Sequence, residues 1–325
     1  MKHLAFAMLV LLTSFLSDAS TAHCEELSLI ETDDAVRISL RGKPVLEYVK
    51  TARPVPEGLA QHYRRSGYIH PVYTPTGQEI SGDYPRDHAH QHALFFAWTK
   101  TTFDGKEYDF WNQAKQSAGI EFRELLNISR EEEQVSFSVK HAFTVGQGDE
   151  RVDVLYEVWT VTVHLTPDDT FLFDIESVQT CASDKPLILE EYHYGGMAFR
   201  ANDQWFHEKS GPNTNNSDQL FLTSDGKDRL SGNHTRPNWV AMTGPLDGQK
   251  ATLVVFCSPQ NFRAPQHVRL HPTKPYFCFA PMVAGKFTIK PGEKYISRYR
   301  YVVMSEAADA RKIDELWDEY AEPTK

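Results

Sequence analysis

The sequence lacks both a second long apolar run and any concentration of positive charge. After residue 16, no stretch approaches the roughly 20 apolar residues that a membrane-spanning helix needs. Lys and Arg number 34 against 44 Asp and Glu, which gives a formal net charge of -10, and no basic stripe interrupts this balance. Because nucleic acids are bound by clustered Lys and Arg, we expect neither a nucleic-acid partner nor a transmembrane segment beyond the N-terminal region.

Cysteine is scarce, and several common site motifs are missing. The chain has 4 cysteines and no C-x-x-C pair, which excludes a zinc knuckle. Cys257 and Cys278 lie in neighbouring apolar segments, where two outcomes stay open: a disulfide, which export permits, or two buried thiols. The sequence contains no G-x-S-x-G, Walker A, G-x-G-x-x-G or H-E-x-x-H pattern. Serine-hydrolase, nucleotide-dependent and Rossmann functions therefore find no support.

The N-terminal residues have the layout of a secretory signal peptide. Lys2 precedes an apolar run over residues 4–16, and small and polar residues follow over residues 17–22. We predict cleavage after Ala22 and a mature chain that is periplasmic or secreted. The alternatives are a retained anchor, for which the apolar run is short, and a lipid on Cys24, for which the preceding residue is unsuited.

Most of the remaining chain is predicted to form strands. Short segments rich in β-branched and aromatic residues are separated by turns that contain Gly, Pro, Asn or Asp. The clearest predicted strands cover residues 135–144, 152–165, 171–180, 251–257 and 295–304. Helix-forming residues predict one helix over residues 305–320, with Ser305 as its N-cap. Residues 23–325 are therefore expected to form a single all-β domain, a large β-sandwich with a C-terminal helix.

The strongest candidate site is a histidine cluster in the segment Tyr84-Pro85-Arg86-Asp87-His88-Ala89-His90-Gln91-His92. Alternate residues of a strand share a face, so an extended segment would place His88, His90 and His92 side by side. Three imidazoles this close cannot all be charged, and neutral imidazole suits both proton transfer and metal binding. The alternative is one core histidine and two that cap backbone groups. Three histidines at alternate positions favour a site.

A second candidate segment is Glu190-Glu191-Tyr192-His193-Tyr194-Gly195-Gly196. If it is extended, Glu191 and His193 share a face, where a carboxylate beside an imidazole can act as an acid–base pair. Tyr194, on the other face, would offer a stacking surface for a sugar ring. The alternative is a surface strand that ends in a Gly-Gly turn. Weaker candidates are His70, Arg86, Arg236, Trp239 and the segment Phe206-His207-Glu208 in the polar stretch 202–238.

These motifs together resemble one protein family, DUF6807, over nearly the whole mature chain. The resemblance is carried by Tyr68-Ile69-His70-Pro71, Pro85-Arg86-Asp87-His88 with the two later histidines, Leu94-Phe95-Phe96-Ala97-Trp98, Tyr192-His193-Tyr194-Gly195-Gly196 and Arg236-Pro237-Asn238-Trp239-Val240. The family also carries the label "methane oxygenase PmoA", but a membrane oxygenase subunit needs several apolar spans. The resemblance implies an exported bacterial β-sandwich with no assigned reaction, similar in appearance to the galactose mutarotase-like supersandwich of sugar epimerases and polysaccharide lyases.

The first of three functional hypotheses is an exported carbohydrate-active enzyme that performs acid–base chemistry on a glycan or sugar derivative. Elimination, epimerisation and hydrolysis all need an acid and a base, and the sequence does not choose among lyase, epimerase and hydrolase. The proposed acid–base residues are His88, His90, His92, His193 and Glu191. The proposed substrate-binding residues are Arg86, His70, Tyr194, Arg236 and Trp239.

Two alternatives use the same segments differently. In one, a divalent metal is bound by His88, His90 and His92, with Glu191 or Asp87 completing the ligand set. In the other, a protein without catalysis binds an oligosaccharide by stacking it on aromatic residues, for which the candidates are Trp98, Trp111, Tyr194 and Trp239. Both enzyme hypotheses require His193 to lie within about one side-chain length of the histidine cluster, in a concave pocket.

Overall fold

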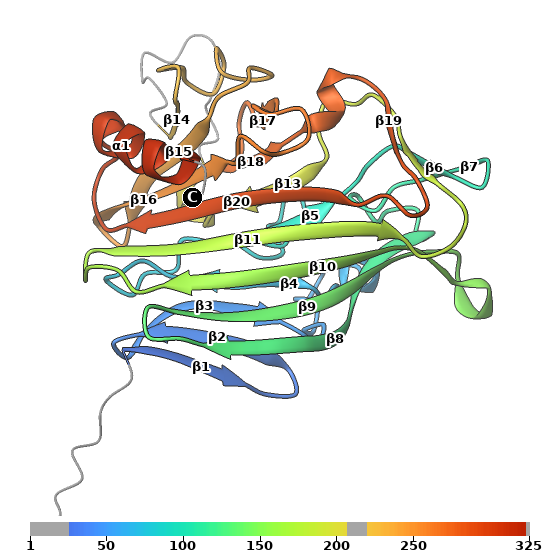
Figure 1. Cartoon of the computed structure of the whole chain (residues 1–325), viewed down its shortest axis with the longest axis horizontal. Coiled ribbons are helices and arrows are strands. Elements are labelled where there is room, and N and C mark those ends of the chain that lie inside the picture. The colour runs from blue at the N-terminus through green and yellow to red at the C-terminus, as the bar shows by residue number, and fades with distance from the viewer. Residues whose placement is uncertain (1–25, 207–219, 323–325) are drawn as a thin grey trace, which may run out of the picture.

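The structure is a computed structural model that describes residues 26–206 and 220–322. The predicted signal peptide, residues 1–22, lies outside the described residues, as do Cys24, His207 and Glu208. The described chain forms three antiparallel sheets and one α-helix, which confirms the predicted all-β class. Its two eight-stranded sheets face each other as a β-sandwich (Figure 1). No helix among residues 26–206 and 220–322 is long and apolar enough to cross a membrane.

The first sheet has the strand order β1-β2-β3-β4-β5-β13-β18-β17. Its strands are β1 (Leu27–Glu31), β2 (Ala35–Leu40), β3 (Lys43–Val49), β4 (Tyr68–Val72), β5 (Leu94–Ala97), β13 (Gly196–Arg200), β18 (Tyr276–Phe279) and β17 (Val268–Leu270). The last four strands of this order carry the candidate site, because they bring together segments that lie far apart in the sequence.

The second sheet has the strand order β14-β15-β16-β20-β11-β10-β9-β8. Its strands are β14 (Phe221–Thr223), β15 (Trp239–Leu246), β16 (Gln249–Cys257), β20 (Tyr295–Met304), β11 (Thr170–Cys181), β10 (Val152–His164), β9 (Gln134–Val145) and β8 (Ala118–Arg130). A small sheet, in the order β19-β12-β6-β7, lies at one end of the sandwich (Figure 1). It consists of β19 (Phe287–Ile289), β12 (Leu187–Leu189), β6 (Thr101–Phe103) and β7 (Lys106–Tyr108).

The predicted strands are confirmed with small shifts at their ends, because their side chains alternate between a buried and a half-exposed face. In β10, from Val154 onward, Leu155 alone interrupts the alternation of buried and half-exposed residues. This period of two residues is what a strand with one face in the core requires. Four 3-10 turns also occur in the described chain: η1 (Gln61–Tyr63), η2 (Gly148–Glu150), η3 (Asp203–Trp205) and η4 (Pro281–Ala284).

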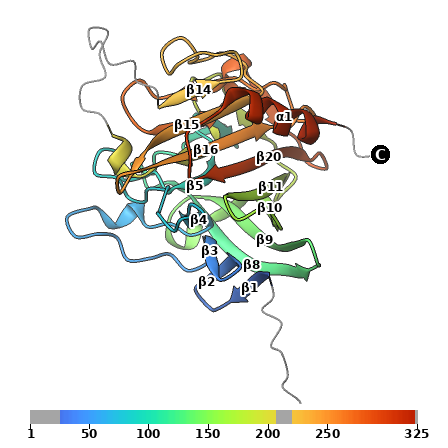
Figure 2. The ribbon, with the colours of Figure 1, turned by 90° about the vertical axis from the view of Figure 1, so that its left-hand side faces the viewer.

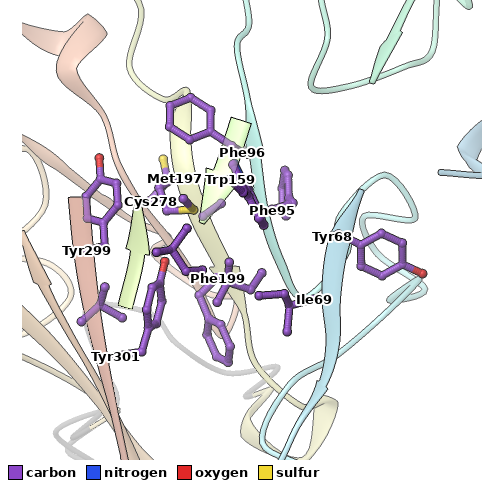
Figure 3. Packing of buried hydrophobic residues seen from close by; sticks show 14 of the residues in the cluster. Tyr68, Ile69, Phe95, Phe96, Trp159, Met197, Phe199, Cys278, Tyr299 and Tyr301 are labelled. Carbon is purple, nitrogen blue, oxygen red and sulfur yellow. The ribbon is translucent and has the colours of Figure 1, made fainter. Parts of the chain in front are cut away.

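The core lies between the two large sheets, whose inner faces contribute mainly aromatic and branched side chains. The ring of Phe279 in β18 stacks on that of Tyr299 in β20 with 5.2 Å between centroids. At the other end of the core, the ring centroid of Tyr48 in β3 lies 5.4 Å from that of Phe137 in β9. Figure 3 shows Tyr299 beside side chains that come from the opposite sheet. Burying such large rings supplies most of the hydrophobic free energy of folding.

One ionic network lies inside this apolar core. His141 Nδ1 is 2.9 Å from Glu157 Oε2, and both side chains are at most 1% exposed. Tyr48 and Ser177 complete the hydrogen bonding of this pair, at 2.6 Å each. A buried charge without partners would cost several kcal/mol, so the network fixes how the two sheets pack. Its side chains have no contact with solvent, and we assign it a structural role.

The C-terminal helix differs from its predicted position. The N-cap of helix α1 (Ala310–Ala321) is Asp309, four residues after the predicted Ser305, and its side chain accepts a hydrogen bond from the Arg311 N–H. Ser305 was wrong as the N-cap because its Oγ contacts Thr76 Oγ1 at 2.8 Å instead. The helix covers the outer face of the second sheet near β15 and β16 (Figure 2). It therefore lies away from the first sheet.

The cysteine question is settled for two of the four residues. Cys257 and Cys278 are buried free thiols, as the second of the two sequence-based alternatives stated. They belong to different sheets: Cys257 ends β16, and Cys278 lies in β18. Tyr276 donates a hydrogen bond to Cys278 Sγ at 3.4 Å. This thiol lies in the part of the first sheet that carries the candidate site.

Candidate active site

The segment that carries the histidine cluster forms two consecutive turns rather than a strand. The N–H of His88 donates to the Pro85 carbonyl at 3.1 Å, and the N–H of Gln91 donates to the His88 carbonyl at 2.8 Å. The prediction that His88, His90 and His92 share one strand face was therefore wrong. The physical reason is that the backbone of this segment bonds to itself and not to a neighbouring strand.

His92 points into the interior and cannot reach a ligand. Its side chain is 0% exposed, and its Nδ1 lies 2.9 Å from Asp83 Oδ1. The ring is enclosed by Tyr68 and Tyr84, at 5.0 and 4.6 Å between centroids. Burial lowers the pKa of His92 despite its hydrogen bond to Asp83. The assignments of His92 as a catalytic residue and as a metal ligand are therefore wrong, because the turn buries it against β4.

Asp87 and His88 form an oriented carboxylate–imidazole pair at the surface. Asp87 Oδ2 lies 2.8 Å from His88 Nδ1. A carboxylate only accepts hydrogen bonds, so Nδ1 carries a proton, and in the neutral ring Nε2 holds the free lone pair. The His88 side chain is 30% exposed, and no hydrogen bond from the described residues engages its Nε2. His88 is thus placed as a proton acceptor.

Two cations hold Asp87 in position. Arg200 of β13 is fully buried. Its Nη2 lies 3.0 Å from Asp87 Oδ1, and its Nη1 lies 3.3 Å from Asp87 Oδ2. Lys274 Nζ lies 3.3 Å from Asp87 Oδ2. Burial raises the pKa of Asp87, but the hydrogen bonds from His88 and Arg200 outweigh it and hold that pKa well below its usual range. Asp87 is therefore ionised at neutral pH and stabilises a proton on His88.

Two neutral histidines flank His88. Its ring lies 5.4 Å from that of His90 and 5.6 Å from that of His271, centroid to centroid. The backbone N–H groups of Thr273 and Lys274 donate to His271 Nδ1 at 3.2 and 3.1 Å, so the proton of the neutral ring is on Nε2. Burial lowers the pKa of both His90 and His271 to about 3. They remain uncharged at neutral pH.

Arg269 lies on the same outer face of the first sheet. In β17, Val268 and Leu270 are buried in the core, so the alternation of the strand turns Arg269 to the opposite side. Arg269 pairs with Cys278 across the ladder to β18. Its guanidinium makes no hydrogen bond and no ion pair with the described residues, and the residue is half-buried.

The loop with His193 and Tyr194 borders this face. The Tyr194 ring lies 5.2 Å from Trp111, which in turn lies 5.9 Å from Tyr276 of β18. The Tyr276 ring lies 5.9 Å from that of His271, so ring contacts connect Tyr194 with His271. We call the surface formed by His88, His90, His193, His271, Arg269 and Tyr194 the histidine face.

His193 is exposed at the rim of the histidine face. Its carbonyl accepts a hydrogen bond from His234 Nε2 at 3.2 Å. Burial and the nearby charge of Arg269 lower the pKa of His193. No ring contact or hydrogen bond in the described chain joins His193 to His88. The charge of Arg269 acts on both His193 and His271, and the His271 ring contacts that of His88, so the link from His193 to the cluster is indirect.

Glycine makes the path of this loop feasible. Gly195 and Gly196 both have φ of 131°, a conformation that side-chain-bearing residues rarely adopt. A Cβ on Gly196 would lie 2.3 Å from the Phe279 carbonyl oxygen, and one on Gly195 would lie 2.6 Å from Met282 Sδ. The pair therefore lets the loop pass tightly over β18 before it enters β13.

Two residues predicted to bind substrate have structural roles instead. His70 is 9% exposed, with its Nδ1 at 3.0 Å from Ser81 Oγ, and burial lowers its pKa to about 4. Trp239 is buried beneath α1. These two assignments are corrected because each side chain is enclosed by protein contacts. Arg236 is exposed, and its guanidinium donates to the Pro265 carbonyl at 2.7 Å.

The remaining predicted residues stay available. Arg86 and Glu191 are exposed, and only the backbone carbonyl of Glu191 is engaged, by Lys100 Nζ at 3.3 Å. Of the aromatic residues proposed for stacking, Trp98, Trp111 and Trp239 are all at most 1% exposed, so none of them can stack directly on a sugar and these assignments are wrong. The Trp98 indole donates to Gln179 at 2.7 Å. Tyr194 is half-buried at the histidine face and keeps its proposed role.

The three-histidine metal site is not formed, because His92 points away from His88 and His90. Across residues 26–206 and 220–322, no group of three or more His, Cys, Asp or Glu side chains is arranged to hold a metal ion.

A polar cavity of about 580 Å³ lies at the start of β8, and its lining includes His62, Arg64 and Arg151. No residue of the histidine face lines it. The ring of Tyr63 separates the two, at 4.1 Å from the ring of His62 and 6.5 Å from that of His90. Arg64 donates to a backbone carbonyl, and Arg151 donates to Thr144.

The sequence-based prediction missed Arg200, Arg269 and His271. The signal for the last two was present, since Arg269 and His271 alternate with apolar Val268 and Leu270 and so share the outer face of a strand. No local pattern marks Arg200, because its partner Asp87 lies 113 residues earlier in the chain.

No curated protein matches the sequence. Solved structures with a similar arrangement include a mutant of the heparan sulfate lyase HepC from Pedobacter heparinus, with a TM-score of 0.40 and 10% identity, covering 87% of this chain and 37% of that one. A GalM/aldose epimerase homologue from C. elegans has a TM-score of 0.31 and 12% identity, covering 86% and 100%. A galactose mutarotase-like protein from Clostridium acetobutylicum has a TM-score of 0.31 and 10% identity, covering 85% and 94%.

The chain spans little more than a third of the length of the lyase, and likenesses at these TM-scores carry no argument about a reaction. The comparison with protein families is more specific. The family DUF6807, described as a family of unknown function, matches residues 35–318. This match includes every described residue of the histidine face, and the chain belongs to the DUF6807 family.

Proposed function

We propose that this chain is a carbohydrate-active enzyme that performs acid–base chemistry at the histidine face. The observation that carries the proposal is the 2.8 Å contact between Asp87 Oδ2 and His88 Nδ1, which leaves Nε2 of His88 free. A carboxylate that fixes the tautomer and orientation of an imidazole is a recurrent way to prepare a general base.

His88 and His271 have complementary roles in this proposal. His88 accepts a proton at Nε2, and the ionised Asp87 stabilises the imidazolium that forms. His271 presents an Nε2–H, because its Nδ1 is occupied by two backbone donors. A neutral imidazole can donate a hydrogen bond to an oxygen that gains negative charge in the transition state. Base and hydrogen-bond donor thus lie side by side.

The environment of the pair suits a sugar. The half-buried ring of Tyr194 borders the face and is backed by the buried rings of Trp111 and Tyr276. Sugars pack their C–H surfaces on aromatic rings while polar groups bind the hydroxyls. We also propose that the chain acts after export, on glycans in the periplasm or outside the cell.

Elimination or epimerisation fits this geometry better than hydrolysis by two carboxylates. Hydrolysis of that kind needs one carboxyl group as an acid and a second as base or nucleophile. Asp87 is held by Arg200, Lys274 and His88, so it is not free for either role. Proton transfer by imidazole remains, with His88 removing a proton and returning it to a leaving oxygen or to carbon.

The test is a screen for turnover and for exchange with solvent hydrogen. Purified protein is incubated in D₂O with neutral and acidic oligosaccharides, and mass spectrometry detects new products and deuterium at carbon. The proposal expects at least one sugar class to react with the wild-type chain and a rate lower by about 10²–10⁴ with His88→Gln. The matched control is His164→Gln, a histidine of β10 whose Nε2 contacts Asp174 at 2.8 Å. Equal rates for His88→Gln and the wild type would overturn the proposal.

A further inference from the structure

We infer that Arg269 binds the carboxylate of an acidic sugar, so that the ligand of the histidine face is a uronic acid or a related sugar acid. The inference rests on the proposed function only in taking the ligand to be a carbohydrate. It concerns binding, and it holds or fails separately from the acid–base role of His88.

The first argument is that Arg269 is unpaired while its neighbours are not. Arg200 contacts Asp87 and Asp203, the latter at 2.7 Å, and Lys274 contacts Asp87 at 3.3 Å. Arg269 has no such partner among the described residues, although it is half-buried in the middle of the three-residue strand β17. A guanidinium presents five N–H donors in a planar fork that matches a carboxylate. Partial burial without a partner leaves these donors for a ligand.

The second argument is the balance of charge at the face. Arg200 pairs with Asp87 and Asp203, and Lys274 pairs with Asp87, whereas no carboxylate of the described residues lies within ion-pair distance of Arg269. The neighbouring imidazoles add no charge, because burial keeps His90 and His271 uncharged with pKa values of about 3. A ligand carboxylate would supply the counter-charge that Arg269 lacks. A neutral sugar would leave a half-buried guanidinium without a counter-charge, which is unfavourable.

The third argument is position relative to the proton acceptor. His271 follows Arg269 by two residues at the end of β17, and its ring lies 5.6 Å from that of His88. A carboxylate bound by Arg269 therefore places the adjacent carbon of the same sugar near His88. Removing the proton from that carbon breaks the C–H bond, and its electron pair passes to the carboxylate. Arg269 stabilises the added negative charge on the carboxylate oxygens.

The intermediate can continue in two balanced ways. The electron pair can return to form a carbon–carbon double bond while the oxygen on the next carbon leaves and takes a proton from the His88 imidazolium. Alternatively, a water molecule on the other side gives the carbon a proton, which inverts its configuration, and the hydroxide that remains is neutralised by the proton on His88. Neither route needs an oxidant or reductant, and both need the carboxylate to be held beside the base.

The experiment measures binding without turnover. Ligand-observed NMR titrations compare D-glucuronate with D-glucose and D-galacturonate with D-galactose, pairs that differ only at C6. We expect the wild-type chain to bind the acids about 10-fold or more tightly than the neutral sugars. Arg269→Gln is expected to lose this preference, and Arg269→Lys to keep part of it, because an ammonium retains the charge but not the fork. Thermal unfolding of each variant checks that it is folded.

Two controls separate this inference from the proposed function. Arg311→Gln removes one positive charge from α1, where the side chain is 91% exposed, and is expected to leave the preference unchanged. His88→Ala is expected to bind the acids as the wild type does, even though it loses turnover. The inference is overturned if the wild type does not prefer the acids, if it binds none of the four sugars, or if Arg269→Gln retains the preference.

Discussion

Arg200 in β13 and Asp87 in the turn before β5 form a two-point contact, with Nη2–Oδ1 at 3.0 Å and Nη1–Oδ2 at 3.3 Å. The contact ties the histidine cluster to the first sheet, because Asp87 also orients His88. Arg200 is fully buried, whereas the Asp87 side chain is 21% exposed. The position of the proton acceptor therefore depends on a residue that does not touch the ligand surface.

Replacing Arg200 should destabilise the fold and displace the turn. Arg200→Met leaves Asp203 without its cation and Asp87 with Lys274 alone, and because both carboxylates are partly exposed we expect a loss of about 1.5–3 kcal/mol, the size of a hydrogen bond to a charged group. Urea unfolding of the wild type and of Arg200→Met measures the difference in free energy. In the double variant with Asp87→Asn, the loss should be smaller than the sum of the two single losses. If the loss of unfolding free energy in the double variant equals the sum of the two single losses, the two residues do not interact.

Asp87→Asn should change the tautomer of His88 with little change in shape. An amide can donate to Nδ1, so the proton of the neutral ring is no longer fixed on Nδ1 and Nε2 is no longer the acceptor. We expect turnover to fall by about 10²–10⁴ and the Michaelis constant to change little. Nitrogen-15 NMR of labelled histidine reports the tautomer directly. An unchanged His88 spectrum in Asp87→Asn would contradict the assigned orientation.

The stability of the fold should decrease between pH 7 and pH 5. Burial lowers the pKa of His90 and His271 to about 3 in the folded chain, whereas histidine in an unfolded chain titrates near 6.5. As the pH falls through this window, the unfolded chain takes up protons that the folded chain does not, so unfolding becomes more favourable. Each such histidine contributes at most about 1.4 kcal/mol per pH unit.

His90→Gln should reduce this slope, because it removes one of the contributing histidines. The measurement is the free energy of unfolding at several pH values for the wild type, His90→Gln and the surface control Arg311→Gln. Asp87 does not confound the comparison, since its lowered pKa affects stability only near and below the range in which an unfolded aspartate titrates. The same slope in the wild type and in His90→Gln would show that His90 is not held neutral.

Two buried tryptophans should differ in their effect on ligand binding. Trp239 Nε1 donates to Asp314 of α1 at 2.8 Å, so Trp239→Phe should cost about 1–3 kcal/mol of stability and leave sugar binding unchanged. Trp111 is equally buried but supports the ring of Tyr194 at the histidine face, so Trp111→Phe should weaken sugar binding by shifting that ring. Unfolding curves and NMR titrations measure both effects. Weaker sugar binding by Trp239→Phe, with the fold intact, would restore its first assignment as a binding residue.

Local patterns in the sequence were sufficient for the sheets. The long strands of the second sheet alternate strongly, and β20 (Tyr295–Met304) has the bounds that its composition predicts. The histidine segment failed the same rule, because alternation says nothing about where the backbone hydrogen bonds go. In the segment from Pro85 to Gln91 they close two turns, and His92 is buried while His88 stays at the surface.

The site depended on contacts between distant segments. Residue type and spacing identified His88, Asp87 and Tyr194, but they did not indicate that Arg200 and His271 complete the surface. The sequence also did not indicate that Trp239 is buried, since its burial requires α1 to pack on β15. A pattern of alternation shows which side chains share a face, whereas the fold decides which faces meet.

The most direct test of the central claim is chemical rescue of a His88→Ala chain by added imidazole, with the substrate found in the screen. The account predicts that His88→Ala loses about 10²–10⁴ of turnover and that imidazole restores part of it, because the small base can occupy the space above Asp87. The control His164→Ala should lose little turnover and respond little to imidazole. Wild-type turnover by His88→Ala would contradict the account, because the proton acceptor would then lie elsewhere.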